Sequence, residues 1–307
     1  MNDFRERFET ACRTRGAEYV SARDAIVAGD FGEDLRRSAL EGSPHERRTA
    51  ETLLAWREHR DVFVEIGSLA RGEFSRKGTM LGSSPVVRGQ AIASRGPDVT
   101  LRVIEILCRS GEAEDAEARS GLFLALGILR DARAVGPLVE ILEGDQPIGM
   151  ICGAIEVLCK MREPAGLEWG LRIAFDRKWQ PAARRTAVYG LSEYADPRVV
   201  PCLLRVLSEE FLSATEKQTA AFALAKLGRA ESREGVLTIL EQPLPDEIRL
   251  PLIQLLGRIG LVSDGALLEE LADREPRLAD LARDSARRVL RRSAAEAKQQ
   301  MNRDGHA

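Results

Sequence analysis

The sequence predicts an all-α solenoid of about seven antiparallel helix pairs, with capping helices at both ends. Aromatic residues make up only 5% of the 307 residues, and helix formers such as Ala, Leu, Glu and Arg are abundant. An apolar stripe with helical spacing recurs every 32 or 33 residues. A chain of this length exceeds one compact core, so we expect either two domains or one elongated array. The repeat favours the array.

The repeat is clearest in residues 121–142, where two apolar stripes flank a polar break. The first stripe lies at Leu122, Ala125, Leu126 and Leu129. The second stripe lies at Val135, Leu138, Val139 and Leu142. Positions i, i+3, i+4 and i+7 share one face of a helix. The segment therefore predicts a helical hairpin with its turn at residues 130–133.

The first stripe recurs four more times downstream. The equivalent positions are Ala154, Val157, Leu158 and Met161; Ala187, Gly190, Leu191 and Tyr194; Ala220, Ala223, Leu224 and Leu227; and Leu252, Leu255, Leu256 and Ile259. Helix breakers stand at the expected turns, at Pro164, Pro197, Gly228 and Gly260. A single hairpin cannot bury both of its apolar faces, so neighbouring hairpins are expected to stack.

Three regions follow from this pattern. Residues 1–40 predict an N-terminal cap of two or three short helices. Residues 41–274 predict the repeat array, which is clearest over 116–272 and includes weaker helix pairs at 44–69 and 85–107. A polar, Gly- and Ser-rich stretch at 71–85 predicts a long loop. Residues 275–307 predict a capping helix to about 298, followed by a disordered tail.

Two segments, 124–142 and 189–207, resemble the short repeats of the PBS-lyase HEAT-like family. The shared pattern is a first helix rich in Ala, Leu and Gly, then an Asp with an Arg two residues later, then a Val-Pro-Leu type of start to the second helix. Here the turn residues are Asp131 with Arg133 and Asp196 with Arg198. The resemblance implies a HEAT-like solenoid. It says little about function, because this repeat serves many roles.

Two groups of enzymes share HEAT-like repeats. Bilin lyases attach tetrapyrroles to phycobiliproteins, and no residue of this chain singles out that activity. Deoxyhypusine hydroxylase binds iron through several His-Glu motifs. This chain has one such dipeptide, His45-Glu46, and its other histidines are His59 and His306, too few for a multi-histidine iron site.

Charge, cysteine content and hydropathy favour a cytoplasmic protein. The net charge of −3 and the pI of about 5.9 argue against a dedicated nucleic-acid binder. The start of the chain lacks the apolar core of a signal peptide, and no stretch reaches the roughly 18 consecutive apolar residues of a membrane span. The five cysteines form no CxxC pair, so we expect reduced thiols in a reducing compartment.

No catalytic constellation is recognisable in the sequence. His45 and His59 lie near several carboxylates, and a metal or acid–base role competes there with an ordinary surface role. Cys152 and Cys159 lie seven residues apart on one predicted helix, which fits packing against a neighbour. We therefore expect no catalytic residues, no metal and no cofactor.

Three surfaces are candidates for binding a partner, in addition to the loop at 71–85, which carries Arg71, Arg76 and Lys77 and either lies on the binding side or has no function. The first is the Trp/Arg segment, which consists of Trp169, Arg172, Phe175, Asp176, Arg177, Lys178 and Trp179. Trp and Arg anchor many protein interfaces, although the two rings would alternatively fill gaps between repeats. The second is the concave face, whose solvent-facing positions on second helices should include Glu105, Glu140, Arg205 and Glu241. Their mixed signs suggest a partner of mixed charge.

The third surface is the basic C-terminal helix. Its arginines include Arg283, Arg287, Arg288, Arg291 and Arg292. Eight basic residues oppose three acidic ones over residues 277–303, a local excess of five positive charges. Such a helix suits an acidic partner, nucleic acid or an anionic membrane, or it serves as polar cover at a solenoid end.

The sequence supports three functional hypotheses. The first is a non-catalytic scaffold or adaptor that holds a protein or peptide on the concave surface. The second is an accessory subunit or lyase-like factor that acts on a protein-bound cofactor. The third is weak nucleic-acid binding through the C-terminal helix. The identity of the partner and the oligomeric state do not follow from the sequence.

Overall fold

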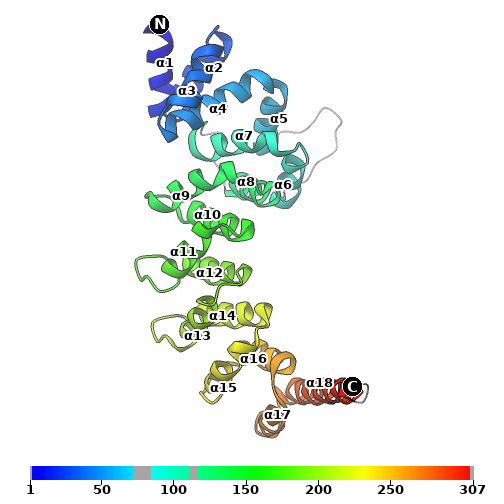
Figure 1. The fold of residues 1–307 in the computed structure, drawn as a ribbon. Coiled ribbons are helices and arrows are strands. Elements are labelled where there is room, and N and C mark those ends of the chain that lie inside the picture. Colours follow the sequence, from blue (N-terminus) through cyan, green and yellow to red (C-terminus); the bar gives the residue numbers. More distant parts are fainter. Residues whose placement is uncertain (1, 72–83, 111–115, 305–307) are drawn as a thin grey trace. The chain divides into compact units, whose positions relative to one another are not determined.

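The computed structural model describes residues 2–71, 84–110 and 116–304, and the regular structure in these ranges is helical throughout (Figure 1). It contains eighteen α-helices within these residues, joined in places by short 3-10 or π turns. The predicted all-α class is confirmed. The chain divides into two compact units, Met1–Glu163 and Pro164–Ala307, a boundary that falls inside the predicted repeat array.

Ten helices form the N-terminal unit. They are α1 (Asn2–Arg13), α2 (Gly16–Ala28), α3 (Gly32–Glu41), α4 (Pro44–Glu58), α5 (Arg60–Ala70), α6 (Pro85–Ala93), α7 (Thr100–Glu105), α8 (Ala116–Leu129), α9 (Val135–Glu143) and α10 (Ile148–Met161). Short turns lie at Pro97–Val99 (η1), Ile106–Ser110 (η2) and Ala132–Ala134 (η3). The predicted pairs at 44–69 and 85–107 correspond to α4 with α5 and α6 with α7.

Packing in the N-terminal unit follows two patterns. Helix α6 packs against α8 and α8 against α10, so the first helices of successive pairs are neighbours. At the start of the chain α1 packs on α2 and α3 on α4, around a core that includes Phe8, Tyr19 and Leu53. Helix α4 begins with a capping box, in which the Ser43 side chain accepts from the Glu46 amide and the Glu46 carboxylate accepts from the Ser43 amide.

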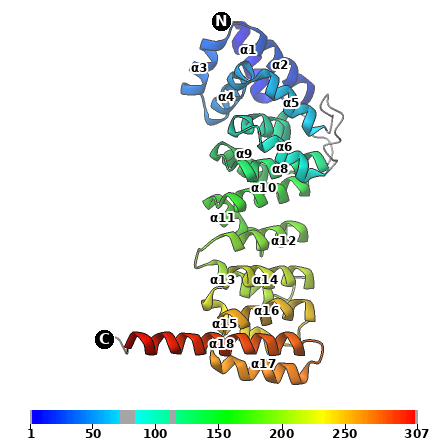
Figure 2. The ribbon, with the colours of Figure 1, turned by 90° about the vertical axis from the view of Figure 1, so that its right-hand side faces the viewer.

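Eight helices form the C-terminal unit. They are α11 (Pro164–Ile173), α12 (Pro181–Gly190), α13 (Val199–Ser208), α14 (Ala214–Leu227), α15 (Arg233–Leu240), α16 (Asp246–Ile259), α17 (Val262–Arg274) and α18 (Ala279–Asp304). Short turns lie at Leu191–Glu193 (η4) and Ala230–Ser232 (η5). Helices α12, α14 and α16 pack in a row, with α13 and α15 on one side (Figures 1 and 2).

The predicted register of the repeat is confirmed by burial. The first three positions of all five stripes are buried, and Leu126, Leu191 and Leu256 are each no more than 1% exposed. Leu126 and Leu256 lie in α8 and α16, and Leu191 occupies the equivalent position directly after α12, at the start of η4. Their complete burial shows that the stripe faces neighbouring helices, as its spacing predicts.

The Asp-x-Arg turns fix the start of a second helix and also reach the preceding pair. The Arg133 amide donates to Asp131 Oδ1 at 2.9 Å, and the Arg198 amide donates to Asp196 Oδ1 at 2.8 Å. The Arg133 guanidinium also donates to the Pro97 carbonyl at 2.8 Å. Hydrogen bonds from Arg198 hold the pKa of the Asp196 carboxyl below its usual value. The Arg198 guanidinium likewise donates to Glu168 of the preceding pair at 2.8 Å. Each turn is therefore fixed within its own helix pair and bonded to the pair before it.

Two further arginines of the C-terminal unit donate to carbonyls of an earlier turn. Arg229 donates to the carbonyls of Ala195 and Asp196, at 3.1 and 3.3 Å. Arg292 of α18 donates to the last carbonyls of α16 and the residue that follows it. These acceptors are Gly257, Arg258 and Gly260. The final carbonyls of a helix lack intrahelical partners, so Arg292 satisfies groups at the end of α16 that would otherwise need water.

The C-terminal helix differs from its predicted bounds. Helix α18 starts at Ala279 and continues through Asp304, so residues 301–304 of the predicted disordered tail are helical. Its buried positions include Ala282, Ala286 and Val289, which face α16 and α17, and its far end extends beyond α17 (Figure 2). Residues 72–83 of the predicted loop and residues 305–307 lie outside the described residues.

Candidate functional site

Four half-buried aromatic rings gather at one end of α11 and α13 in the C-terminal unit. Trp169 lies on α11, Phe175 and Trp179 lie in the α11–α12 connection, and Phe211 lies in the α13–α14 connection. The Trp169 and Trp179 rings are perpendicular, with centroids 6.2 Å apart. This edge-to-face arrangement is a favourable geometry for two aromatic rings.

Each of the four rings carries a cation above its face. Four pairs share this arrangement: Arg172 lies 4.9 Å from the Trp169 centroid, Lys178 5.5 Å from Trp179, Arg205 4.2 Å from Phe175 and Arg177 4.4 Å from Phe211. A cation over an exposed aromatic face contributes roughly 0.5–1 kcal/mol. We call these eight residues the aromatic–cation cluster. It brings together six of the seven residues of the predicted Trp/Arg segment, all but Asp176, and adds Phe211 and, from the predicted concave face, Arg205.

The connection that carries Trp179 is anchored on both sides. Asp176 Oδ1 accepts from the Lys178 amide at 3.1 Å, and the Trp179 amide donates to the Asp176 carbonyl at 3.1 Å. The Trp179 carbonyl accepts from Arg184, whose Nε lies 2.6 Å from Glu216 Oε1 in a buried ion pair. Pro181 then starts α12. The ring of Trp179 is thus presented by a fixed turn.

All four rings of the cluster are partly buried. None of the four is buried as a core residue, and none is fully exposed. Among the described residues, the indole N–H of Trp179 is buried without a hydrogen-bond acceptor.

Phe211 is a member of the cluster that the sequence analysis missed. It lies 32 residues after Trp179, which is one repeat step. Alignment of successive repeats, which reveals the apolar stripe, would therefore have paired Phe211 with Trp179 as aromatic residues at equivalent positions of two successive connections.

The prediction that Glu105 faces solvent is wrong. Its side chain is 1% exposed and accepts three hydrogen bonds: from Arg23 at 2.9 Å, Arg102 at 2.9 Å and the Trp56 indole at 2.7 Å. The two guanidiniums also lie 4.1 and 4.7 Å from the Trp56 ring centroid. Helix α2 packs on η2 and α4 on α7, so they cover the face of α7 that a regular repeat would leave open. Glu105 is therefore a structural residue of the N-terminal unit.

The other predicted positions on second helices are exposed. Glu140 on α9 forms an ion pair with Arg48 of α4. Arg205 on α13 lies 3.8 Å from Glu209 as well as over Phe175. Glu241 directly follows α15. Of these, Arg205 alone belongs to the aromatic–cation cluster.

Carboxylates offset much of the predicted positive charge of the C-terminal helix. Arg283 lies 2.9 Å from Asp273 and 3.9 Å from Glu269, both on α17 and outside the stretch over which the excess was counted. Asp284 pairs with Arg287 and Arg288, at 3.8 and 2.7 Å. Arg292 is occupied by the carbonyls at the end of α16, and Arg291 is exposed. This pattern fits polar cover of a terminal helix more closely than a polyanion-binding face.

The two described histidines have separate surroundings. His45 Nε2 lies 2.7 Å from the Cys12 carbonyl, and the His59 ring lies 6.3 Å from the Phe63 ring. Within the described residues, no group of three or more His, Cys, Asp or Glu side chains is placed to hold a metal ion. No helix in the same residues is long and apolar enough to cross a membrane.

Comparison with known proteins gives no relative on which to base a function. No family model matches the chain, and no curated protein matches it. The resemblance to HEAT-like repeats therefore stays a prediction from the sequence.

Proposed function

We propose that this protein is a non-catalytic interaction scaffold, and that a protein or peptide partner docks on the aromatic–cation cluster. The observation that supports the proposal is the set of four half-buried rings, each under a cation, at one end of α11 and α13. Trp and Arg supply a large share of binding free energy at protein interfaces.

We also propose that the helix pairs form a HEAT-like solenoid in which α11 and α13 are second helices that line a binding face. The support is the confirmed burial of the stripe at 32- or 33-residue steps. The neighbouring first helices of each unit, α6, α8 and α10 and then α12, α14 and α16, add to it. Each pair contributes a similar helix end, so side chains from successive connections form one continuous surface.

The cluster suits recognition for an energetic reason. Its rings are already held by packing and by cations, so binding would lose little side-chain entropy on them. The Trp179 indole lacks an acceptor among the described residues, and a buried unsatisfied donor is unfavourable by about 1–3 kcal/mol. A partner that shifts the ring and supplies a carbonyl or carboxylate oxygen would recover that free energy.

Site-specific photo-crosslinking tests the docking surface. A benzophenone amino acid replaces Gln180, an exposed residue next to Trp179 that is not one of the proposed anchors, in one variant and Phe222 in a matched control. Phe222 is 49% exposed on α14, outside the cluster. In native extract, the variant at position 180 should crosslink one protein reproducibly, and the control should not.

Affinity for the crosslinked protein then tests the anchors. Trp169→Ala and Arg172→Ala should each weaken its binding by about 30-fold, the effect of a strong interface anchor, whereas Phe222→Ala should change binding by less than about 2-fold. Circular dichroism checks that each variant is folded. Equal crosslinking at both positions, or unchanged affinity in folded Trp169→Ala and Arg172→Ala proteins, would refute the proposed surface.

A further inference from the structure

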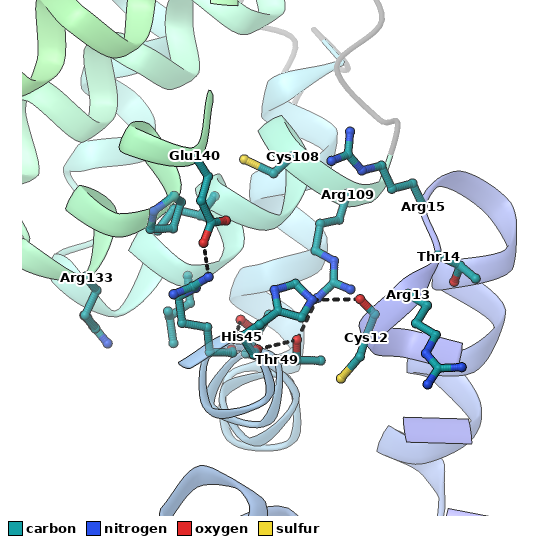
Figure 3. Close-up of a pocket in the computed structure, with 15 residues that line it drawn as sticks. Cys12, Arg13, Thr14, Arg15, His45, Thr49, Cys108, Arg109, Arg133 and Glu140 are labelled. Atoms are coloured by element: carbon teal, nitrogen blue, oxygen red, sulfur yellow. Dashed lines mark hydrogen bonds and ion pairs between the residues drawn. The ribbon is translucent and has the colours of Figure 1, made fainter. Parts of the chain in front are cut away.

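A small cavity of about 190 Å³ lies within the N-terminal unit, where four segments meet (Figure 3). It is bounded by the end of α1, the start of α4, the α7–η2 segment and the η3–α9 segment. The volume is several times the roughly 30 Å³ that one water molecule takes in the liquid. It is smaller than the roughly 300 Å³ at which drug-sized pockets begin. It therefore suits a small ion or a single functional group.

Arginine dominates the charge around this cavity. Five arginines and one acidic residue line it: Arg13, Arg15, Arg48, Arg109, Arg133 and Glu140. The side chains of Arg13 and Arg133 point away at opposite edges (Figure 3). They lie 3.9 Å from Glu9 and 2.5 Å from Asp131 respectively. Arg48 pairs with Glu140. Arg15 and Arg109 have no carboxylate partner among the described residues, so the described part of the inner wall carries an excess of two positive charges.

Arg109 is held in place by neutral groups. It donates to Thr49 Oγ1 at 2.8 Å and to the Ala11 carbonyl, and its guanidinium lies 4.7 Å from the buried Tyr19 ring centroid. Thr49 in turn donates to the His45 carbonyl at 3.0 Å. None of these partners neutralises the guanidinium. Its orientation is therefore fixed while its charge stays available.

Four of the charged side chains that line the cavity act on the thiol of Cys108. Burial raises the pKa of Cys108 to about 11. Arg15, Arg109 and Arg48 act on the same sulfur in the opposite direction, and Glu140 adds to the rise. All four charges thus lie within electrostatic reach of one atom. The thiol is protonated near neutral pH and removes none of the excess positive charge.

We propose that this cavity binds a phosphate group, with Arg15 and Arg109 as its principal ligands. Phosphate carries a charge of about −1.5 to −2 near neutral pH, which matches the excess of two, whereas a carboxylate brings one negative charge. A guanidinium presents paired N–H donors that suit phosphate oxygens. The group is either free inorganic phosphate or the phosphate of a phosphorylated side chain. The proposal does not depend on the aromatic–cation cluster, which belongs to the other unit.

Calorimetric titration of the full-length protein with sodium phosphate, in a phosphate-free buffer of low ionic strength, tests the site. Arg15→Gln should weaken phosphate binding by about 10-fold or more, because it removes a charge-assisted donor pair. Arg13→Gln is the matched control, since Arg13 lines the same cavity but points away (Figure 3), and it should change affinity by less than about 2-fold. Arg15 is exposed and carries no side-chain partner among the described residues, so its replacement should leave the fold intact.

A second variant is expected to change affinity in the opposite direction. Glu140→Gln releases Arg48 and removes the one acidic side chain of the wall, so it should tighten phosphate binding by about 3- to 10-fold. Loss of folding cannot produce tighter binding, so this result would separate the site from a general effect on stability.

Further titrations identify the source of the phosphate and the specificity of the site. N-acetyl-O-phosphoserine amide binding at least as tightly as sodium phosphate would assign a phosphorylated side chain. Binding of sodium phosphate alone would assign free phosphate, and both results support the site. Acetate binding as tightly as phosphate, equal affinities of the Arg15→Gln and Arg13→Gln proteins, or no tightening in Glu140→Gln would overturn the proposal.

Discussion

Replacing Glu105 by Gln tests the conclusion that this residue is structural. The carboxylate is buried between Arg23, Arg102 and the Trp56 indole. Glutamine keeps the shape and one acceptor oxygen, but it removes the negative charge and turns an N–H group toward at least one donor. The buried guanidiniums of Arg23 and Arg102 would then lose the carboxylate that they share, although Arg23 keeps its ion pair with Asp24 at 2.9 Å, so the N-terminal unit should lose stability.

The expected magnitude follows from the burial of all three partners. Breaking a buried ion pair from one side costs about 3–5 kcal/mol. Because glutamine retains one acceptor, we expect about 3 kcal/mol, at the lower end of that range. With a slope of about 2 kcal/mol per molar urea, the midpoint of unfolding should fall by about 1.5 M.

Tryptophan fluorescence can follow the urea unfolding of the N-terminal unit by itself. Trp56 lies in the N-terminal unit and is 5% exposed, whereas Trp169 and Trp179 lie in the C-terminal unit. In a Trp169→Phe, Trp179→Phe background, fluorescence of Trp56 reports urea unfolding of the N-terminal unit alone. This separation matters because two units need not unfold in one transition.

Glu140→Gln is the matched control, since the sequence predicts the same exposed role for Glu140 and Glu105. Its ion pair with Arg48 is exposed, and exposed pairs contribute at most about 1 kcal/mol. A change below about 0.5 kcal/mol in Glu105→Gln, or about 0.25 M in the midpoint, would fall in the range of surface substitutions. That result would contradict the conclusion that Glu105 stabilises the N-terminal unit through buried hydrogen bonds and ion pairs.

Three further predictions concern the C-terminal unit. Leu191→Ala and Leu256→Ala should each destabilise it by about 2–5 kcal/mol through lost burial and a residual cavity, measured by urea unfolding. Arg292→Ala should lower its melting temperature because helix-end carbonyls lose their donor, whereas Arg291→Ala at the exposed neighbouring position should change it little. Burial raises the pKa of Glu216, but the hydrogen bonds it accepts outweigh burial and leave the pKa lowered. The contribution of Glu216 to the free energy of unfolding is therefore fully present above the unfolded pKa of about 4.3 and is lost as the pH falls through the lower folded pKa. Glu216→Gln should flatten the dependence of the free energy of unfolding on pH in that range.

The helical class and the repeat register were predictable because both depend on local spacing. The stripe that includes Leu126 and Leu256 has a period fixed by the helix itself, so the sequence alone identifies the buried face. The Trp/Arg segment was also predictable as a candidate, because Trp169 and Trp179 lie within one connection and its flanking helix.

The surroundings of Glu105 were not predictable, because they depend on contacts between distant parts of the chain. Arg23 comes from α2, 82 residues away, and helical periodicity does not reveal which side chain a capping helix brings to a repeat. The arginine cavity has the same origin. Arg15, Arg109 and Glu140 come from three separate segments, and only folding of the unit places them around one space.

The arginines that contact an earlier turn give the repeats of the C-terminal unit a direction. Arg229 donates to carbonyls about one repeat before it, and Arg292 does the same at the end of α16. During synthesis, a turn therefore lacks these donors until the next repeat has emerged and folded. If the chain were truncated from its C-terminal side, carbonyls in the last remaining turn would lose their arginine donor. If the preceding repeat were lost instead, the arginine side chain would lose its acceptors and would be hydrated.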